Sequence, residues 1–176
     1  MIYLIPTDTC FGLACNINDI EGYNEIYNIK NRDYQKLIAI ILPDFESLEK
    51  NTFITKEQIK FLKNYKRPFS VLLKPKNKDF FINKNISNYD LYGKISFRVA
   101  NKINSNFIKK TGYLFLTSAN ISGFPETYNL DEIKKQFGEN YKKLELISNI
   151  KKIPFSLPSD IIEFNENNEI IYLRKN

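Results

Sequence analysis

The chain contains no histidine and only two cysteines, Cys10 and Cys15, among its 176 residues. Without histidine, a Ser-His-Asp triad, a Cys-His pair and a histidine proton shuttle are all excluded. The cysteines lie five residues apart and form no C-x-x-C motif, which excludes a zinc finger. We expect both to be small buried hydrophobic residues. Any catalysis must therefore rely on positioning and fixed charge.

Long hydrophobic runs are also missing. No stretch of about 18 apolar residues occurs, which argues against a membrane-spanning helix. The first ten residues, MIYLIPTDTC, lack the basic region and long apolar core of a signal peptide and do not resemble a transit segment. Hydrophobic residues make up 43% and charged residues 26% of the chain, as in soluble globular domains. We therefore expect a single-domain cytoplasmic protein.

The formal net charge is +6, and the basic excess is greatest between residues 60 and 78. That stretch contains no acidic residue, and such a patch suits the phosphates of a nucleotide or of RNA. A solvated lysine face would give the same pattern. The cations are Lys60, Lys63, Lys66, Arg67, Lys74, Lys76 and Lys78.

Apolar strand patterns alternate with amphipathic helix patterns along the whole chain. Helix patterns cover 18–32, 55–65, 103–112 and 130–138, and strand patterns cover 2–6, 36–42, 69–74, 94–99, 113–117, 144–148, 160–164 and 169–174. No repeat, low-complexity block or long linker interrupts them. We predict one α/β domain over residues 1–176, built on a twisted open sheet of mixed strand directions with flanking helices. Ligands on such sheets bind where strands end.

Polar side chains cluster where several predicted strands and the first helix end. Each cluster taken alone is compatible with an ordinary turn. If the clusters meet in space, their hydroxyls, amide and cations form a receptor for carboxylate and phosphate groups. The residues concerned are Thr7, Thr9, Lys30, Arg32, Lys36, Arg98, Thr117, Ser118 and Asn120.

Two spacings indicate where these cations point. In ISFRV, the period of two places Ser96 and Arg98 on one strand face and the apolar residues on the other. An exposed strand residue would show the same alternation. Lys30 and Arg32 are two residues apart, so in an extended or loosely helical segment both can reach oxygens of one polyphosphate.

Together, five segments resemble the YrdC/Sua5 family of threonylcarbamoyl-AMP synthases in order and spacing. They are PTDTCFGLAC, IKNRDYQKLIAII, ISFRV, TSANISG and PSDII…YLR, and the likeness extends from about Ile2 to Arg174. The resemblance implies a YrdC/RibB-like open sheet with a large concave cavity. It implies a nucleotidyltransferase that joins L-threonine, bicarbonate and ATP, with Mg²⁺ on the phosphates, into L-threonylcarbamoyladenylate and pyrophosphate. A partner transferase would then move the threonylcarbamoyl group to an adenosine beside a tRNA anticodon.

The resemblance also implies roles for individual residues. The catalytic residues would be Lys30, Arg32, Ser118 and Asn120. The ATP site would comprise Lys30, Arg32, Lys36, Ser118, Asn120 and Arg174. The threonine site would comprise Thr9, Arg98, Leu116 and Ser159, with the Arg98 guanidinium holding the carboxylate. No protein ligand for the metal is implied.

The chain departs from the family pattern at several positions. Arg67 stands where glycine is usual, Asp160 where threonine is common, and Ile41 where some relatives carry a histidine near the threonine site. Most relatives have a helix before the first strand, so we expect an N-terminally shortened domain. The second domain of the longer Sua5 form is expected to be absent.

Two other functions remain open. The basic run between residues 60 and 78 also suits a non-catalytic module that binds double-stranded RNA or tRNA on the same fold. A third possibility is an adenylating domain that uses carbamoyl phosphate, as in hydrogenase maturation. That version normally belongs to a much longer chain with zinc-finger-like cysteines.

Overall fold

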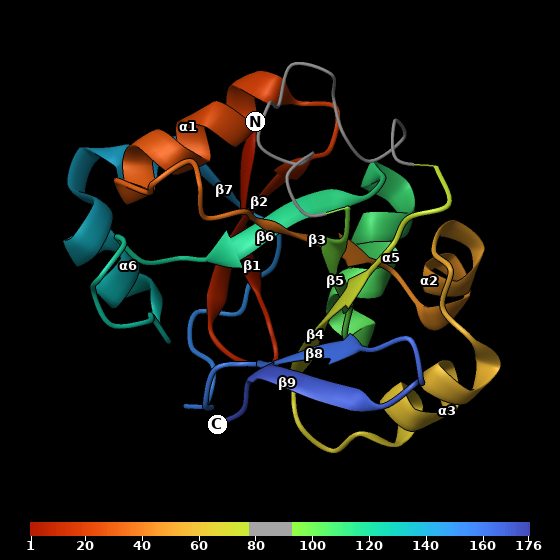
Figure 1. Ribbon diagram of the computed structural model, residues 1–176. Helices are drawn as coiled ribbons and strands as arrows, with labels where there is room; N and C mark the ends of the chain where they lie inside the picture. Colours follow the sequence, from red (N-terminus) through yellow and green to blue (C-terminus); the bar gives the residue numbers. More distant parts are fainter. Residues whose placement is uncertain (78–92) are drawn as a thin grey trace.

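The computed structural model describes residues 1–77 and 93–176 (Figure 1). Within them, nine strands form one sheet. The strands are β1 (Ile2–Pro6), β2 (Phe11–Asn16), β3 (Ala39–Leu42), β4 (Phe69–Leu73), β5 (Ile95–Val99), β6 (Leu114–Ser118), β7 (Leu144–Leu146), β8 (Asp160–Phe164) and β9 (Ile170–Arg174). The helices are α1 (Ile20–Lys30), α2 (Phe45–Asn51), α3 (Lys56–Asn64), α5 (Lys102–Thr111) and α6 (Leu130–Phe137), with a 3₁₀ helix at Gly138–Lys143.

The sheet is mixed, as predicted. Its strand order is β7-β1-β2-β6-β3-β5-β4-β8-β9. The pairs β1–β7, β3–β5 and β4–β8 are parallel, and the remaining neighbours run antiparallel. The two C-terminal strands form the expected hairpin, whose turn places Asn168 in the left-handed region at φ 62°.

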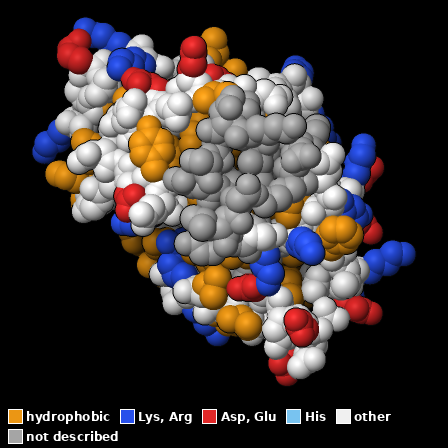
Figure 2. All heavy atoms as spheres, turned by 45° about the horizontal axis from the view of Figure 1, so that its top comes forward, with side chains coloured by type: hydrophobic (Ala, Val, Ile, Leu, Met, Phe, Trp, Pro, Cys, Tyr) orange, Lys and Arg blue, Asp and Glu red, His pale blue; other side chains and the backbone are white. Residues whose placement is uncertain are grey.

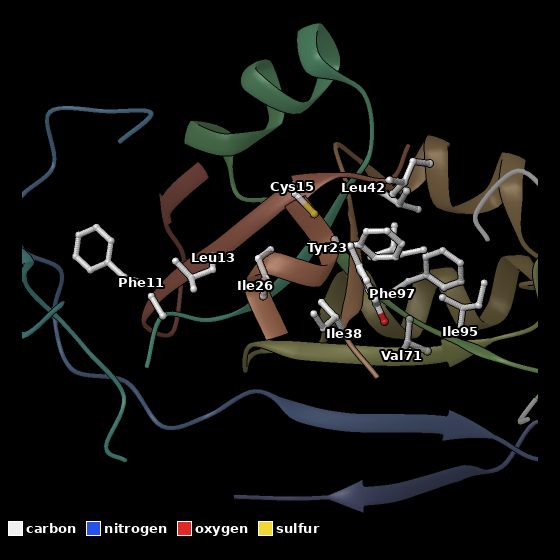
Figure 3. Close-up of a cluster of buried hydrophobic side chains, with 14 of the residues drawn as sticks. Phe11, Leu13, Cys15, Tyr23, Ile26, Ile38, Leu42, Val71, Ile95 and Phe97 are labelled. Carbon is white, nitrogen blue, oxygen red and sulfur yellow. The ribbon is translucent and has the colours of Figure 1, made fainter. Parts of the chain in front are cut away.

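One face of the sheet packs against four helices. Side chains of α1, α2, α3 and α6 join the inward residues of seven strands in one core. In Figure 1, α1 and α6 lie toward the left and α2 and α3 toward the right. Figure 3 shows part of this core, where Leu13 and Cys15 of β2 lie near Tyr23 and Ile26 of α1. The helices therefore shield this face from solvent.

The opposite face carries a smaller core beneath α5. Ile108 of α5 packs with side chains from the centre of the sheet, and the buried members of this cluster are Ile5, Ala14, Ile41, Ile108, Leu114 and Leu116. Ser70 of β4 and Ser96 and Arg98 of β5 lie on the same face farther along the sheet, beside Ile161 of β8. This part of the face forms the floor of the cavity described below.

Helix boundaries follow local capping chemistry. The Asp19 carboxylate accepts the Gly22 N–H at 2.8 Å and starts α1. Asn31 ends the same helix in the left-handed conformation, with φ 49°. A capping box between Thr55 and Gln58 starts α3.

Three differences from the sequence predictions have physical causes. The predicted strand 36–42 begins only at Ala39, because the carbonyls of Lys36 and Leu37 accept hydrogen bonds from the Arg32 guanidinium. The patterns do not predict β2, whose sequence FGLACN is rich in small residues of low strand propensity. They also miss α2, a seven-residue helix capped by Asp44.

None of the helices in the described residues has the length and apolar character needed to cross a membrane.

Candidate functional site

A cavity of about 420 Å³ opens on the face of the sheet that carries α5. This volume lies within the usual range of ligand pockets. Small side chains at Gly12, Ala39, Ser70 and Ser96 make the hollow. A Cβ at Gly12 would lie only 2.6 Å from Leu116 Cδ1 and 3.2 Å from the Thr117 carbonyl oxygen, so a larger residue there would displace the Leu116 side chain and crowd β6.

Most of the predicted site residues line this cavity. They are Thr9, Arg32, Arg98, Leu116, Ser118, Ser159 and Arg174. Three predicted residues do not line it: Lys30 and Asn120 are buried behind it, and Lys36 is exposed to solvent. The cavity thus gathers residues from both ends of the chain and from its middle.

Lys30 is the last residue of α1, and its side chain is only 1% exposed. Its ammonium group donates to the carbonyl oxygens of Ser118 and Asn120 and to the Asn120 side-chain oxygen. The Ser122 N–H in turn donates to the Lys30 carbonyl at 2.8 Å. Lys30 therefore anchors the segment 118–122 and does not lie beside Arg32 in the cavity, contrary to the expectation from their spacing.

Burial lowers the pKa of Lys30 to about 7, and the positive charge of Arg32 acts in the same direction. The three oxygens around Nζ oppose this shift, because an ammonium group has three N–H donors and a neutral amine has two. The contacts of Nζ thus match the charged form.

Arg32 reaches the cavity because Asn31 reverses the backbone between it and Lys30. Its Nε and Nη2 donate to the carbonyls of Lys36 and Leu37 at 2.8 and 2.9 Å, and the guanidinium lies 5.9 Å from the centre of the Tyr27 ring. These partners are uncharged. Arg32 is therefore held in place with its positive charge uncompensated by any carboxylate contact in the described residues.

The segment TSANISG is organised by hydrogen bonds within and beneath it. The Ser118 hydroxyl lies 2.6 Å from the Asn120 oxygen, and the Asn120 amide nitrogen donates to the Phe124 carbonyl at 2.6 Å. The Ala119 N–H donates to Phe11 of β2 at 2.7 Å, which extends the sheet contact beyond β6. The Ser118 side chain is thereby fixed at the cavity wall.

The turn between β1 and β2 supplies the adjacent part of the wall. The Thr7 hydroxyl donates to the Cys10 carbonyl at 2.7 Å and lies 3.1 Å from the Thr9 hydroxyl. Thr9 is buried, and both threonines line the cavity. Cys10 also lines it as a free buried thiol, and burial raises its pKa to about 11. Both cysteines are buried, as expected.

Arg98 points to the cavity side of β5, as the alternation in ISFRV predicts. Its Nη2 donates to the Asp8 carboxylate at 2.5 Å, and the two residues form an ion pair. Ile41 lies beside Arg98 in the parallel pairing of β3 and β5, but its side chain packs under α5. Sequence patterns do not reveal the contact with Asp8, because the partners are 90 residues apart.

Arg174 of β9 binds Ser159 at the end of the cavity nearest β8 and β9. Its guanidinium donates to the Ser159 carbonyl at 2.7 and 2.9 Å and lies 3.2 Å from the Ser159 hydroxyl. Both side chains line the cavity. As with Arg32, the partners of this guanidinium are uncharged.

Arg67 and Asp160, two residues at which the chain departs from the family pattern, form an ion pair. Arg67 Nε lies 3.0 Å from a carboxylate oxygen of the fully buried Asp160, without the alignment of a hydrogen bond. The Tyr65 hydroxyl donates to the same oxygen at 2.5 Å, and the Asn176 N–H donates to the other at 2.9 Å. This network holds the backbone beside Ser159.

Acid should weaken the contribution of Asp160 to stability. Burial by itself raises the pKa of the carboxyl, but the hydrogen bonds from Tyr65 and Asn176 and the charge of Arg67 outweigh it and lower the pKa. A carboxyl with a lowered folded-state pKa stabilises the fold above the unfolded pKa of about 3.9, and this stabilisation is lost as the pH falls through the folded-state value.

We expect Asp160→Asn to lower the free energy of unfolding by about 2 kcal/mol at pH 7. The difference from the wild type should shrink below pH 4, because the wild-type carboxylate then becomes protonated. Urea unfolding at pH 7, 4 and 2.5 measures both effects. Asp131→Asn is the control, because the Asp131 side chain is 95% exposed. A difference that stays constant with pH would contradict the proposed ionic role.

The charges around the cavity are predominantly positive. Arg32, Arg98 and Arg174 line it, whereas Glu126 is the one acid among its described lining residues. Sequence patterns gave no signal for Glu126, whose carboxylate lies 3.3 Å from the Tyr128 hydroxyl. The cavity is thus suited to ligands that carry more than one negative group.

The basic run is separate from this cavity. Lys60 and Lys63 lie on α3 beside a shallower hollow, Arg67 pairs with Asp160, and Lys78 lies outside the described residues. On the face drawn in Figure 2, Lys and Arg side chains are interspersed with Asp and Glu side chains around the rim. The described residues of that face do not form a stripe of one charge.

Comparison with known proteins gives a consistent family match. The model of the Sua5/YciO/YrdC family, described as telomere recombination, matches residues 1–176. A protein of Methanocaldococcus jannaschii is 29% identical over 177 residues, which cover 99% of this chain and 79% of that protein. The threonylcarbamoyl-AMP synthase of Haemophilus ducreyi is 30% identical over 145 residues, covering 80% of this chain and 77% of the relative.

Solved structures share the fold. P. abyssi Sua5 in complex with L-threonine superposes with a TM-score of 0.78 at 23% identity over 98% of this chain. Full-length HypF in its phosphate- and nucleotide-bound form also superposes with a TM-score of 0.78 at 23% identity over 98% of this chain. The chain spans about half of that Sua5 chain (49%) and about a quarter of HypF (26%).

Proposed function

Because the chain belongs to the Sua5/YciO/YrdC family, we propose that it is an L-threonylcarbamoyladenylate synthase. It would form this adenylate and pyrophosphate from L-threonine, bicarbonate and ATP. The feature that supports the proposal most is the convergence of three arginines with the hydroxyls of Thr9, Ser118 and Ser159 in one cavity. These groups are the ones that carboxylates and phosphates require.

The proposed reaction does not require a covalent intermediate with the protein. The threonine amine takes up bicarbonate with release of water, which gives a carbamate. A carbamate oxygen then attacks the α-phosphorus of ATP, the bond from that phosphorus to the bridging oxygen breaks, and pyrophosphate leaves. Two anions must be held in contact while charge builds up on a phosphoryl group. Fixed cations and oriented donors provide this stabilisation, so the absence of histidine is no obstacle.

In this proposal, Arg32, Ser118 and Arg174 bind the nucleotide. Arg32 and Arg174 are held by uncharged carbonyls, so their positive charges are available to phosphate oxygens. Lys36 follows Arg32 at the exposed rim and would add charge there. Lys30 and Asn120 act from behind, since they fix the segment that presents Ser118.

The threonine side of the cavity would be formed by Arg98, Thr9, Leu116 and Ser159. A guanidinium matches a carboxylate in shape and charge, so Arg98 would hold the amino-acid carboxylate. Thr9 and Ser159 are buried hydroxyls that can orient the amine and the side chain, and Leu116 would provide apolar contact.

Mg²⁺ would enter with the phosphates of ATP. The described residues contain no group of three or more His, Cys, Asp or Glu side chains that could form a dedicated metal site. Mg²⁺ commonly takes one or two protein carboxylates together with substrate phosphates and water. Glu126 is the lining carboxylate that fits this pattern, and the ion would neutralise charge on the leaving pyrophosphate.

The product would pass to a transferase that modifies an adenosine in tRNA. Both steps would take place in the cytoplasm. A non-catalytic RNA-binding module is the less favoured function, because it gives no reason for three arginines to converge in one cavity.

Pyrophosphate release tests the proposal. We expect release from ATP that depends on both bicarbonate and L-threonine, with L-serine and glycine as control amino acids. Carbamoyl phosphate in place of threonine and bicarbonate tests the HypF-like alternative. Release with carbamoyl phosphate alone would favour that alternative. No release, together with no ATP binding, would contradict the synthase and favour the RNA-binding module.

A further inference from the structure

Arg98 has a partner that the other arginines of the cavity lack. Its Nη2 donates to the Asp8 carboxylate, whereas Arg32 and Arg174 donate to uncharged groups, mainly backbone carbonyls. Arg98 is therefore the lining arginine whose charge is compensated by a carboxylate. The same guanidinium is the one proposed above to hold the carboxylate of the substrate.

We propose that Asp8 is an internal placeholder, which occupies Arg98 when the amino-acid site is empty and must leave when the substrate carboxylate binds. The inference rests on the proposed function, because it takes L-threonine as the ligand. It assigns Asp8 a role in selecting ligands that carry a free carboxylate.

The exposure of the two side chains indicates which of them moves. The Asp8 side chain is 45% exposed, whereas the Arg98 side chain is 13% exposed and lies on a central strand. Rotating Asp8 into solvent restores its hydration at little cost, whereas the Arg98 side chain is mostly buried and has little access to solvent. Exchange of the two carboxylates therefore needs only a change of the Asp8 side chain.

The turn that carries Asp8 does not depend on this ion pair. Its backbone is closed by the Thr7 N–H and the Thr7 hydroxyl, which both donate to the Cys10 carbonyl at 3.2 and 2.7 Å. Thr9, next to Asp8, is buried and stays against the cavity. Asp8 can thus leave Arg98 while the walls of the site keep their shape.

A placeholder makes the site selective for a free carboxylate. A ligand with a carboxylate displaces Asp8 and replaces one ion pair with another, whereas a ligand with an amide cannot replace the ion pair and leaves Asp8 on Arg98. The competition also weakens the apparent affinity for threonine, which equals the intrinsic affinity multiplied by the fraction of molecules in which Arg98 is free. Removing the Asp8 charge should therefore tighten threonine binding and leave amide ligands unaffected.

Isothermal titration calorimetry can test this with L-threonine, L-threoninamide and ATP. We expect Asp8→Asn to bind L-threonine roughly 2- to 5-fold more tightly than the wild type, the range of a partly exposed ion pair. Affinity for L-threoninamide should be unchanged, and affinity for ATP should change less than about twofold. Asp131→Asn, which removes an exposed charge on α6, should behave as the wild type. Asp8→Ser serves as a second variant if the asparagine disturbs the turn.

Several outcomes would overturn the inference. Unchanged threonine affinity would mean that Asp8 does not compete. Weaker threonine binding would mean that Asp8 contacts the bound amino acid, for instance at its ammonium group. Equal gains for threonine and ATP would mean a general charge effect. A wild-type protein that binds ATP but not threonine would instead contradict the proposed function, and this inference with it.

Discussion

Lys30→Met should reduce pyrophosphate release by roughly 100- to 1,000-fold, although Lys30 does not line the cavity. The substitution leaves the carbonyls of Ser118 and Asn120 and the Asn120 side-chain oxygen without their shared donor. The segment that presents Ser118 then loses its anchor on α1, and small displacements of positioning groups have large effects on rate. Steady-state kinetics with saturating ATP and threonine measures the effect.

The same substitution should lower the free energy of unfolding by about 2–4 kcal/mol, because buried acceptors without a donor cost about 1–3 kcal/mol each and part of the loop can rehydrate. Lys36→Met is the matched control, since Lys36 is exposed and should change stability by less than about 0.5 kcal/mol. A Lys30→Met variant with normal stability and normal rate would refute the anchoring role.

Arg98→Ala should raise the KM for threonine by roughly 30- to 1,000-fold while the KM for ATP changes less than about threefold. Truncating one partner of a buried charge pair typically costs about 2–4 kcal/mol, which corresponds to this range. Pyrophosphate release measured against each substrate in turn separates the two constants.

Arg32→Ala should have the reverse effect of Arg98→Ala. Because Arg32 is assigned to the nucleotide, the substitution should raise the KM for ATP more than the KM for threonine. Arg98→Lys should recover part of the threonine affinity, since it keeps the charge but loses the planar fork. Equal changes in both KM values for Arg98→Ala would argue against separate anion sites.

Much of the sheet follows from local sequence patterns. The apolar runs of β1, β3 and β6 and the alternation in β5 are properties of a few consecutive residues, so they can be predicted without knowledge of the fold. β2 is different, because Gly12, Ala14 and Cys15 are small residues whose place in a central strand depends on close approach to β6. Such a requirement is set by a neighbour more than 100 residues away.

In the site, too, some features follow from local sequence and others depend on distant residues. The side of β5 on which Arg98 lies follows from the period of two, and the structure confirms it. The burial of Lys30 could not be predicted, because it depends on the left-handed Asn31 and on carbonyls 88 and 90 residues further along the chain. The contacts of Arg98 with Asp8 and of Arg67 with Asp160 are likewise long-range. Sequence patterns therefore indicate which residues gather but not which of them pair.

The most direct test is detection of the product itself. The protein would be incubated with ATP, Mg²⁺, L-threonine and ¹³C-labelled bicarbonate, and the mixture analysed at once by liquid chromatography and mass spectrometry. We expect an adenylate with the mass of threonylcarbamoyl-AMP that carries one ¹³C atom and is absent when threonine is replaced by L-threoninamide. Formation of AMP and pyrophosphate without a labelled adenylate, or an unlabelled adenylate of threonine alone, would contradict the proposed reaction.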